Sequence, residues 1–121
     1  MHELSLAQNI VDVVAAALPD AGGGEVRVVH LQVGELAGVV PDALLFCYDI
    51  VTRDTPLAGS RLEIELLPIV IFCSTCDRTV ELSGVQSFRC PTCNTPSSDI
   101  RQGRELQVKS FEVEVSEVPR D

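Results

Sequence analysis

Two cysteine motifs, Cys73-Ser74-Thr75-Cys76 and Cys90-Pro91-Thr92-Cys93, lie thirteen residues apart in the second half of the chain. In a CxxC motif two thiolates can turn toward one point, and a second motif can complete a tetrahedron of thiolates around zinc. The separation falls just short of the ~15–20 residues that are typical of such paired motifs. We therefore predict a structural zinc ion, with each motif at the tip of a short hairpin, bound by Cys73, Cys76, Cys90 and Cys93.

Two other uses of paired cysteines compete with the zinc site. Two disulfides would require an oxidising compartment, but the N-terminal region lacks the basic and apolar segments of a signal peptide. A thioredoxin-like redox pair usually lies in a β-α-β context, which this stretch does not suggest. No run approaches the ~20 apolar residues of a membrane span. We therefore expect a cytoplasmic protein with reduced thiols.

Length and charge limit the possible functions. The chain has 121 residues, which suits one domain with a small insert, and its net charge is −9. Nucleic acids and anionic lipids are bound through Lys and Arg, so we expect neither a nucleic-acid nor a membrane partner. Many zinc ribbons do bind nucleic acid, so a zinc-ribbon adaptor or nucleic-acid-binding module is the alternative function.

Hydrophobic periodicity predicts two helices and a series of strands. The first helix starts near Glu3 or Ser5 and is stopped by Pro19, and Pro41 suits the first position of the second. The expected helices run to Leu18 and over 41–53. The expected strands cover 25–33, 61–67, 69–72, 79–82, 87–89 and 105–115.

These elements predict an α+β fold in which two helices pack on a three-stranded sheet. Residues 69–103 form a four-cysteine, zinc-ribbon-like insert between two strands of that sheet, and residues 1–68 and 104–118 form the parent domain. A segment of about 30 residues buries too little surface to fold alone. The zinc ion is therefore expected to hold the insert together.

The last predicted strand changes its buried face along its length. Leu106 and Val108 share one parity, whereas Phe111 and Val113 share the other. A slip of one residue moves every side chain to the opposite face. We therefore predict a β-bulge or a twist near Lys109-Ser110.

The cysteine quartet is better suited to structure than to catalysis. Four thiolates fill a tetrahedral shell, whereas a catalytic zinc keeps one position open for water or substrate. We therefore do not expect a zinc-dependent hydrolase, and no other motif in the sequence requires an enzyme.

Four residues outside the motifs are also of interest. Cys47 is interpreted as a small buried residue of the second helix, and His30 as a half-exposed or hydrogen-bonded sheet histidine. Asp42 suits the first turn of the second helix, where a negative charge is favourable. His2 follows Met1, so an amine, an amide and an imidazole stand together, and nitrogen-rich planar sites suit Ni(II) or Cu(II). Most terminal histidines have no such role.

Several motifs taken together resemble those of the HypA/HybF family, whose members are nickel metallochaperones for the maturation of NiFe-hydrogenases. The resemblance covers essentially the whole chain. It is carried by the two CxxC motifs together with Met1-His2-Glu3, Val33-Gly34-Glu35-Leu36, Arg61-Leu62-Glu63-Ile64-Glu65, Gly103-Arg104-Glu105-Leu106 and Lys109-Ser110.

The resemblance implies two metals with separate tasks. Nickel would bind the terminal amine of Met1, the backbone and imidazole of His2 and the backbone amide of Glu3, while zinc would bind the four cysteines. The implied partners are a GTPase of the HypB type and the hydrogenase large subunit. In some members an aspartate before the second helix also binds nickel; the equivalent place here is Val40, with Asp42 nearby. The sequence leaves open whether the protein is a homodimer.

Overall fold

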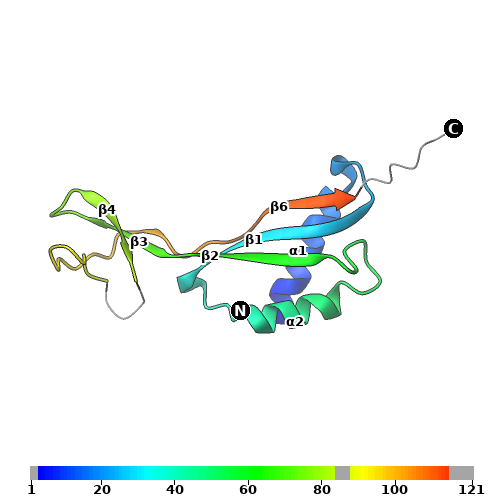
Figure 1. The fold of residues 1–121 in the computed structure, drawn as a ribbon, viewed down its shortest axis with the longest axis horizontal. Helices are drawn as coiled ribbons and strands as arrows, with labels where there is room; N and C mark the ends of the chain where they lie inside the picture. Colours follow the sequence, from blue (N-terminus) through cyan, green and yellow to red (C-terminus); the bar gives the residue numbers. More distant parts are fainter. Residues whose placement is uncertain (1–2, 84–87, 115–121) are drawn as a thin grey trace. The chain divides into compact units, whose positions relative to one another are not determined.

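The computed structural model describes residues 3–83 and 88–114, and its elements form two helices and two three-stranded sheets (Figure 1). The strand orders are β2-β1-β6 and β4-β3-β5. The predicted α+β class, with two helices and a four-cysteine zinc-ribbon-like site, is confirmed. In chain order the elements are α1 (Glu3–Ala17), the 3-10 turn η1 (Pro19–Ala21), β1 (Glu25–Gly34), the 3-10 turn η2 (Glu35–Ala37), α2 (Pro41–Val51), β2 (Arg61–Leu67), β3 (Ile69–Cys73), β4 (Arg78–Leu82), β5 (Ile100–Gln102) and β6 (Leu106–Glu114).

The chain divides into two compact units. The first comprises residues 1–31, 39–64 and 108–121, and the second comprises 32–38 and 65–107. Within the described residues, no helix is long and apolar enough to cross a membrane. Both helices belong to the first unit, and the cysteine motifs belong to the second.

Helix α1 provides much of the core of the first unit. It begins at Glu3, the earlier of the two expected starts. Its buried face follows the helical period, since its buried residues are Leu6, Ala7, Ile10, Val11 and Val14. Pro19 and the left-handed Gly22 then turn the chain toward β1. Helix α1 packs against helix α2.

Helix α2 is anchored by its two buried residues, Leu44 and Tyr48. The Tyr48 hydroxyl lies 2.6 Å from Ser60 Oγ, and burial raises the pKa of this phenol. The helix ends at Val51, two residues before the expected end. The buried Thr52 caps it, since both its N–H and its hydroxyl donate to the Tyr48 carbonyl, at 3.1 and 2.8 Å.

Strands β1 and β6 both change their buried face part-way along. In β1 the buried positions switch parity between Val28 and Val29. In β6 the half-buried positions switch parity between Val108 and Phe111. The β-bulge or twist expected near Lys109-Ser110 stays a prediction.

The second unit has its own small core around β3. Ile69, Ile71 and Leu82 are buried, and Leu36, Val80, Phe88 and Ile100 pack against them. The strand expected over 87–89 is replaced in the described residues by a single bridge between Arg89 and Pro96. Strand β5, which the sequence did not predict, pairs with β3. Three residues are too few for a periodic pattern, so only the pairing reveals this strand.

Two glycines bring distant segments of the second unit into backbone contact. A Cβ on Gly34 would overlap the carbonyl group of Gly103. The Gly34 N–H donates to the Glu105 carbonyl at 2.8 Å, and the Leu36 N–H donates to the Gly103 carbonyl at 2.7 Å. The φ and ψ of Gly34, −76° and 151°, are open to any residue. Space, rather than backbone conformation, therefore requires glycine here.

We predict that Gly34→Ala lowers the free energy of unfolding by about 3 kcal/mol, because the added methyl group must push the Gly103 backbone out of its hydrogen bonds. Urea unfolding of zinc-saturated protein measures this change. Gly38→Ala is the control within the same unit: its φ is 74° and nothing lies within 4 Å, so only the backbone strain of about 1–2 kcal/mol remains. Equal costs for the two variants would show that the Gly34–Gly103 contact relaxes easily.

Candidate metal centre

The four cysteines of the two motifs converge on one point. Their sulfur atoms all lie within 4.8 Å of one another. Cys73 Sγ and Cys93 Sγ are 3.5 Å apart, and Cys76 Sγ and Cys90 Sγ are 3.9 Å apart. A zinc–sulfur distance of about 2.3 Å implies sulfur–sulfur edges of about 3.8 Å in a tetrahedron. The spacing therefore fits a four-coordinate metal ion.

The alternative of two disulfides is wrong for this structure. All five cysteines are free, and the sulfur–sulfur distances of 3.5 and 3.9 Å far exceed the ~2.05 Å of a disulfide bond. Cys47 is half-buried rather than buried. It lies on α2 beside Phe46, whose side chain is 69% exposed.

Each motif is shaped by a left-handed residue that directly follows it. Asp77 follows Cys76 with φ 55°, and Asn94 follows Cys93 with φ 62°. Asp and Asn are among the residues that adopt this conformation most readily. Neither residue was among the predicted site residues, although their shared position directly after a CxxC motif was a visible signal.

The two turns bring the cysteines inward by hydrogen bonding. Pairing of Cys73 with Arg78 closes the β3–β4 hairpin, as predicted for the first motif. In the second motif, the Asn94 N–H donates to the Cys90 carbonyl at 2.7 Å, and the Cys90 N–H donates to the Thr95 carbonyl at 2.9 Å. The bridge between Arg89 and Pro96 continues this second turn.

The first cysteine of each motif is buried and the second is more accessible. Cys73 and Cys90 are 0% and 1% exposed, whereas Cys76 is half-buried and Cys93 is exposed. A bound ion would therefore have a protein side and a solvent side. Since all four positions of a tetrahedral shell are thiolates, the centre has no open position for a reacting water.

The charge of the four thiols favours a bound cation. The hydroxyl and backbone N–H of Thr95 lower the pKa of Cys93 to about 6. The adjacent Cys93 and the burial of the thiol raise the pKa of Cys76 to about 12. Four thiols at this spacing cannot all ionise at neutral pH unless a positive ion compensates the charge.

Thr95 connects the two motifs through its hydroxyl group. Thr95 Oγ1 lies 3.0 Å from Cys93 Sγ and 3.0 Å from Thr75 Oγ1. Groups that contact metal ligands hold them in place and adjust their charge. Thr95 is therefore a supporting residue of the centre, and the CxxC spacing alone did not reveal it.

We predict that Thr95→Val weakens zinc binding about tenfold, because the Cys93 thiolate loses a hydroxyl contact. Competition against a chromogenic chelator measures the dissociation constant. Thr92→Val is the matched control: Thr92 lies inside the second motif, but its hydroxyl accepts from Arg78 at 3.2 Å. Equal effects of the two substitutions would remove any special role for Thr95.

The predicted nickel ligands are only partly within the described residues. Met1 and His2 lie outside them. Glu3 is the first residue of α1, and its carboxylate accepts a hydrogen bond from the Val40 N–H at 3.1 Å. Asp42 lies in the first turn of α2, where its charge suits the helix dipole. Across residues 3–83 and 88–114, the cysteine quartet is the one metal-ligand cluster.

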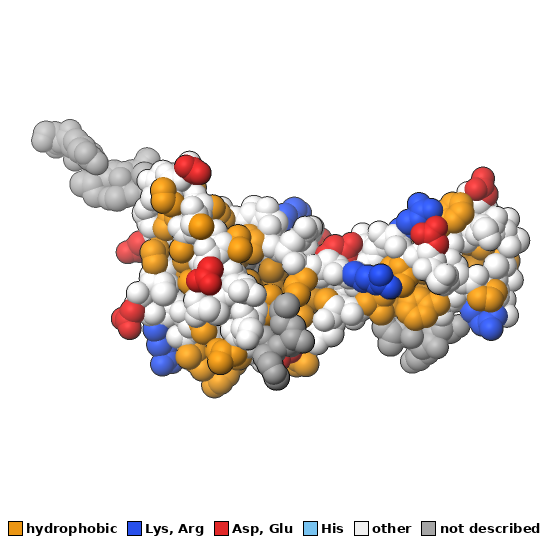
Figure 2. Space-filling model, turned by 180° about the vertical axis from the view of Figure 1, so that it is seen from behind, with side chains coloured by type: hydrophobic (Ala, Val, Ile, Leu, Met, Phe, Trp, Pro, Cys, Tyr) orange, Lys and Arg blue, Asp and Glu red, His pale blue; other side chains and the backbone are white. Residues whose placement is uncertain are grey.

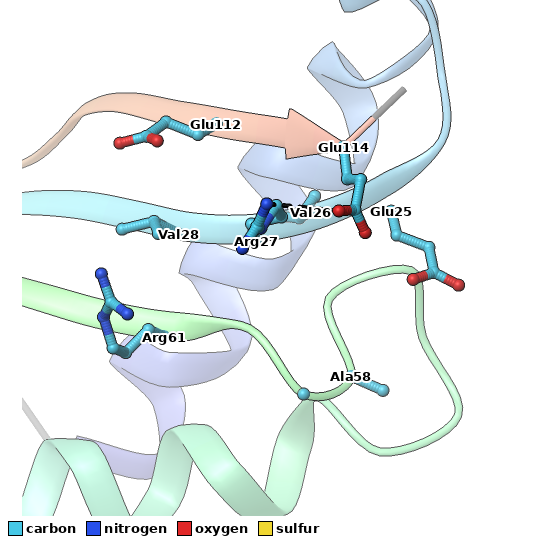
Figure 3. Close-up of a pocket in the computed structure, with 9 residues that line it drawn as sticks. Glu25, Val26, Arg27, Val28, Ala58, Arg61, Glu112 and Glu114 are labelled. Atoms are coloured by element: carbon cyan, nitrogen blue, oxygen red, sulfur yellow. Dashed lines mark hydrogen bonds and ion pairs between the residues drawn. The ribbon is translucent and has the colours of Figure 1, made fainter. Parts of the chain in front are cut away.

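A pocket of about 600 Å³ lies on the first unit, and none of its lining residues is a predicted metal ligand (Figure 3). Its charged lining comes from Glu25, Arg27, Arg61, Glu112 and Glu114. Arg27 pairs with Glu114 at 3.2 Å.

His30 contacts Glu112, which is one of the residues that line this pocket. It is 2.7 Å from Glu112 and 37% exposed, which confirms the expected half-exposed, hydrogen-bonded histidine.

Comparison with protein families identifies a match over residues 1–113. The matching family is described as "Hydrogenase/urease nickel incorporation, metallochaperone, hypA". The match includes Met1-His2-Glu3 and both cysteine motifs.

Curated relatives and solved structures agree with this match. The hydrogenase maturation factor HypA of Chloroflexus aurantiacus is 47% identical over 112 residues, which cover 93% of this chain and 98% of the relative. That of Desulfosudis oleivorans is 41% identical over 114 residues, which cover 93% and 98%. The solution structure of the nickel metallochaperone HypA from Helicobacter pylori superimposes with a TM-score of 0.66 at 17% identity, covering 93% and 97% of the two chains. This chain therefore belongs to the HypA family of nickel-incorporation metallochaperones.

Proposed function

We propose that this protein binds nickel at its N-terminus and delivers it to the large subunit of a NiFe-hydrogenase during maturation of that enzyme. The observation that carries the proposal is the family match over residues 1–113, which includes the terminal Met1-His2-Glu3 and the cysteine quartet. The family is one of metallochaperones, so the prediction that the chain is not an enzyme is confirmed.

The ion at Cys73, Cys76, Cys90 and Cys93 is proposed to be zinc with a structural role. Soft thiolate ligands in a tetrahedral arrangement suit zinc, and the sulfur–sulfur distances of 3.5 and 3.9 Å support that geometry. A closed shell holds its ion tightly and gives a partner protein no open position. The ion that is passed on must therefore bind elsewhere.

Nickel is proposed to bind the amine of Met1, the backbone and imidazole of His2 and the backbone amide of Glu3. A nitrogen-rich set of this kind suits Ni(II). Glu3 begins α1, and the first N–H groups of a helix lie outside its internal hydrogen-bond ladder. Ligands at a chain terminus can also rearrange at little cost in packing, which favours transfer.

The partners and the compartment follow from the same proposal. A GTPase of the HypB type and the hydrogenase large subunit are the proposed contacts, and the cytoplasm is the proposed location because the free thiols suit a reducing environment. A homodimer stays compatible with this function.

The surface does not favour the alternative of a nucleic-acid-binding module. Figure 2 shows basic side chains in separate groups, with acidic ones among them, and no continuous basic surface on the face it presents. The two arginines between the outer cysteines make contacts within the second unit: Arg78 donates to Thr92 and Arg89 to the Asn94 carbonyl. A phosphate backbone would need several unpaired cations along one path.

We predict that His2→Ala abolishes specific nickel binding and leaves zinc binding intact, because the imidazole is lost while the cysteine centre is untouched. Metal content after equilibrium dialysis, measured by mass spectrometry on untagged protein, gives both stoichiometries. An N-terminal tag is expected to reproduce the nickel loss by masking the amine. Normal nickel binding by His2→Ala would refute the terminal site.

For Cys73→Ala we predict the opposite result, namely loss of zinc binding with nickel binding intact. The variant should lose zinc and the structure of the insert over 69–103, whereas the proposed parent domain, 1–68 and 104–118, keeps its helices. Hydrogen exchange resolved by peptide measures the two regions separately, and Cys47→Ala controls for the loss of a cysteine. Collapse of exchange protection in α1 and α2 as well would show that the parent domain is not independent.

A further inference from the structure

A serine hydroxyl bridges two segments of the second unit that lie next to the cysteine motifs. Ser97 Oγ donates to the Phe72 carbonyl at 2.6 Å, although the two residues are 25 positions apart in the chain. Phe72 directly precedes Cys73, and Ser97 lies in the segment that leaves the second motif. The half-buried hydroxyl therefore ties the exit of the second motif to the entry of the first.

This hydroxyl takes the place of a backbone donor beyond the end of β5. The Phe72 N–H donates to the Asp99 carbonyl at 2.9 Å. In an antiparallel ladder two such residues exchange both of their N–H···O bonds. Here the return bond runs through the side chain: the Asp99 N–H donates to Ser97 Oγ at 3.2 Å, and Ser97 Oγ donates to the Phe72 carbonyl. Ser97 thus extends the pairing with β3 up to the residue before Cys73.

A restraint on the Phe72 carbonyl is also a restraint on Cys73. The Phe72 carbonyl and the Cys73 N–H belong to one planar peptide unit, so the hydrogen bond limits the directions in which the Cys73 side chain can point. Cys73 Sγ lies 3.5 Å from Cys93 Sγ and accepts from the Cys76 N–H at 3.4 Å. Cys73 is also fully buried. Its sulfur atom must therefore be placed accurately for the cluster to close around an ion.

We infer that Ser97 is a positioning residue of the cysteine centre: its hydroxyl holds the Phe72–Cys73 peptide so that the Cys73 thiolate faces the other three sulfur atoms. Ser97 is not itself a ligand. This role rests on the proposed zinc ion at the cysteine quartet. Removal of a group that orients a metal ligand typically costs about 10–100-fold in metal affinity, and a ligand that is already oriented loses less entropy when the ion binds.

The same segment is held from a second side, so the hydroxyl can be removed without releasing β5 from β3. The Arg101 guanidinium lies 4.7 Å from the centroid of the Phe72 ring. It also donates to both carboxylate oxygens of Asp99, at 2.7 and 2.9 Å. Phe72 and Asp99 thus stay linked through Arg101 in Ser97→Ala. We expect this substitution to loosen Cys73 while the zinc-loaded insert stays folded.

The experiment measures the zinc affinity of the full chain and the reactivity of its single cysteines. Chelator competition gives the zinc dissociation constant. Pulsed alkylation with iodoacetamide, resolved by mass spectrometry, gives the labelling rate of each cysteine in the zinc-loaded protein. Cys73 and Cys90 are both buried, so each reacts only when its own part of the centre opens. The ratio of their rates separates a local effect on Cys73 from general unfolding.

We expect Ser97→Ala to weaken zinc binding about tenfold and to raise the labelling rate of Cys73 about tenfold relative to that of Cys90. Ser97→Thr keeps a hydroxyl that can donate and accept, so it should restore both quantities. Ser98→Ala is the matched control and should change neither. Ser98 is exposed, and the bond from the Ile100 N–H to its carbonyl does not depend on its side chain.

Leu82→Ala distinguishes positioning from a loss of stability. Leu82 belongs to the core of the second unit, so its truncation should weaken zinc binding through folding and raise the labelling of both Cys73 and Cys90. An equal rise at the two cysteines in Ser97→Ala would show that Ser97 acts in the same way, and would overturn the positioning role. A defect in Ser97→Thr as large as that in Ser97→Ala would also overturn it, because the hydroxyl would then not be the cause.

The unchanged protein tells a failure of the zinc centre from a failure of the positioning role. If it holds no zinc after dialysis against zinc, the proposed zinc centre is refuted and the role of Ser97 with it. If it holds zinc, and Ser97→Ala has the same zinc affinity and the same Cys73 labelling, only the positioning role is overturned.

Discussion

The mutual repulsion of four thiolates is the constraint on which the second unit depends. Their sulfur atoms lie within 4.8 Å of one another. The neighbouring Cys93 raises the pKa of Cys76 to about 12, whereas the hydroxyl and backbone N–H of Thr95 lower the pKa of Cys93 to about 6. A divalent cation bound by the four sulfur atoms would remove this conflict and would cross-link the β3–β4 hairpin to the second motif. The small core around Ile69, Ile71 and Leu82 has few residues, so such a cross-link would add stability that burial alone cannot supply.

The same chemistry makes this centre unsuitable for carrying cargo. A shell with four protein ligands gives a receiving protein nothing to displace except the ligands that hold the fold together. A metal that must leave requires ligands whose loss costs little structure. The proposed nickel ligands at the start of α1 would meet this requirement, because the helix buries Leu6, Ile10 and Val14 through apolar packing. An ion that is held permanently and an ion that is passed on thus require ligands in different parts of the chain.

Periodic and short-range features were predictable from the sequence, and single contacts between distant segments were not. The apolar stripe of α1 and the change of face in β6 follow from side-chain spacing, and the CxxC motifs predicted the cysteine cluster. Strand β5 has too few residues for a periodic pattern. The Val40–Glu3 hydrogen bond joins residues that no local pattern relates. The left-handed Asp77 and Asn94 were accessible to local reasoning, since each directly follows a motif.

The Gly34–Gly103 contact gives a structural reason for two of the sequence motifs that carry the family resemblance. The motifs Val33-Gly34-Glu35-Leu36 and Gly103-Arg104-Glu105-Leu106 meet through backbone hydrogen bonds and a contact that excludes a Cβ. These motifs therefore encode a packing requirement of the fold. The functional assignment rests instead on Met1-His2-Glu3 and the four cysteines. A chain that kept both glycine motifs but lacked the terminal histidine would keep this fold without the proposed nickel site.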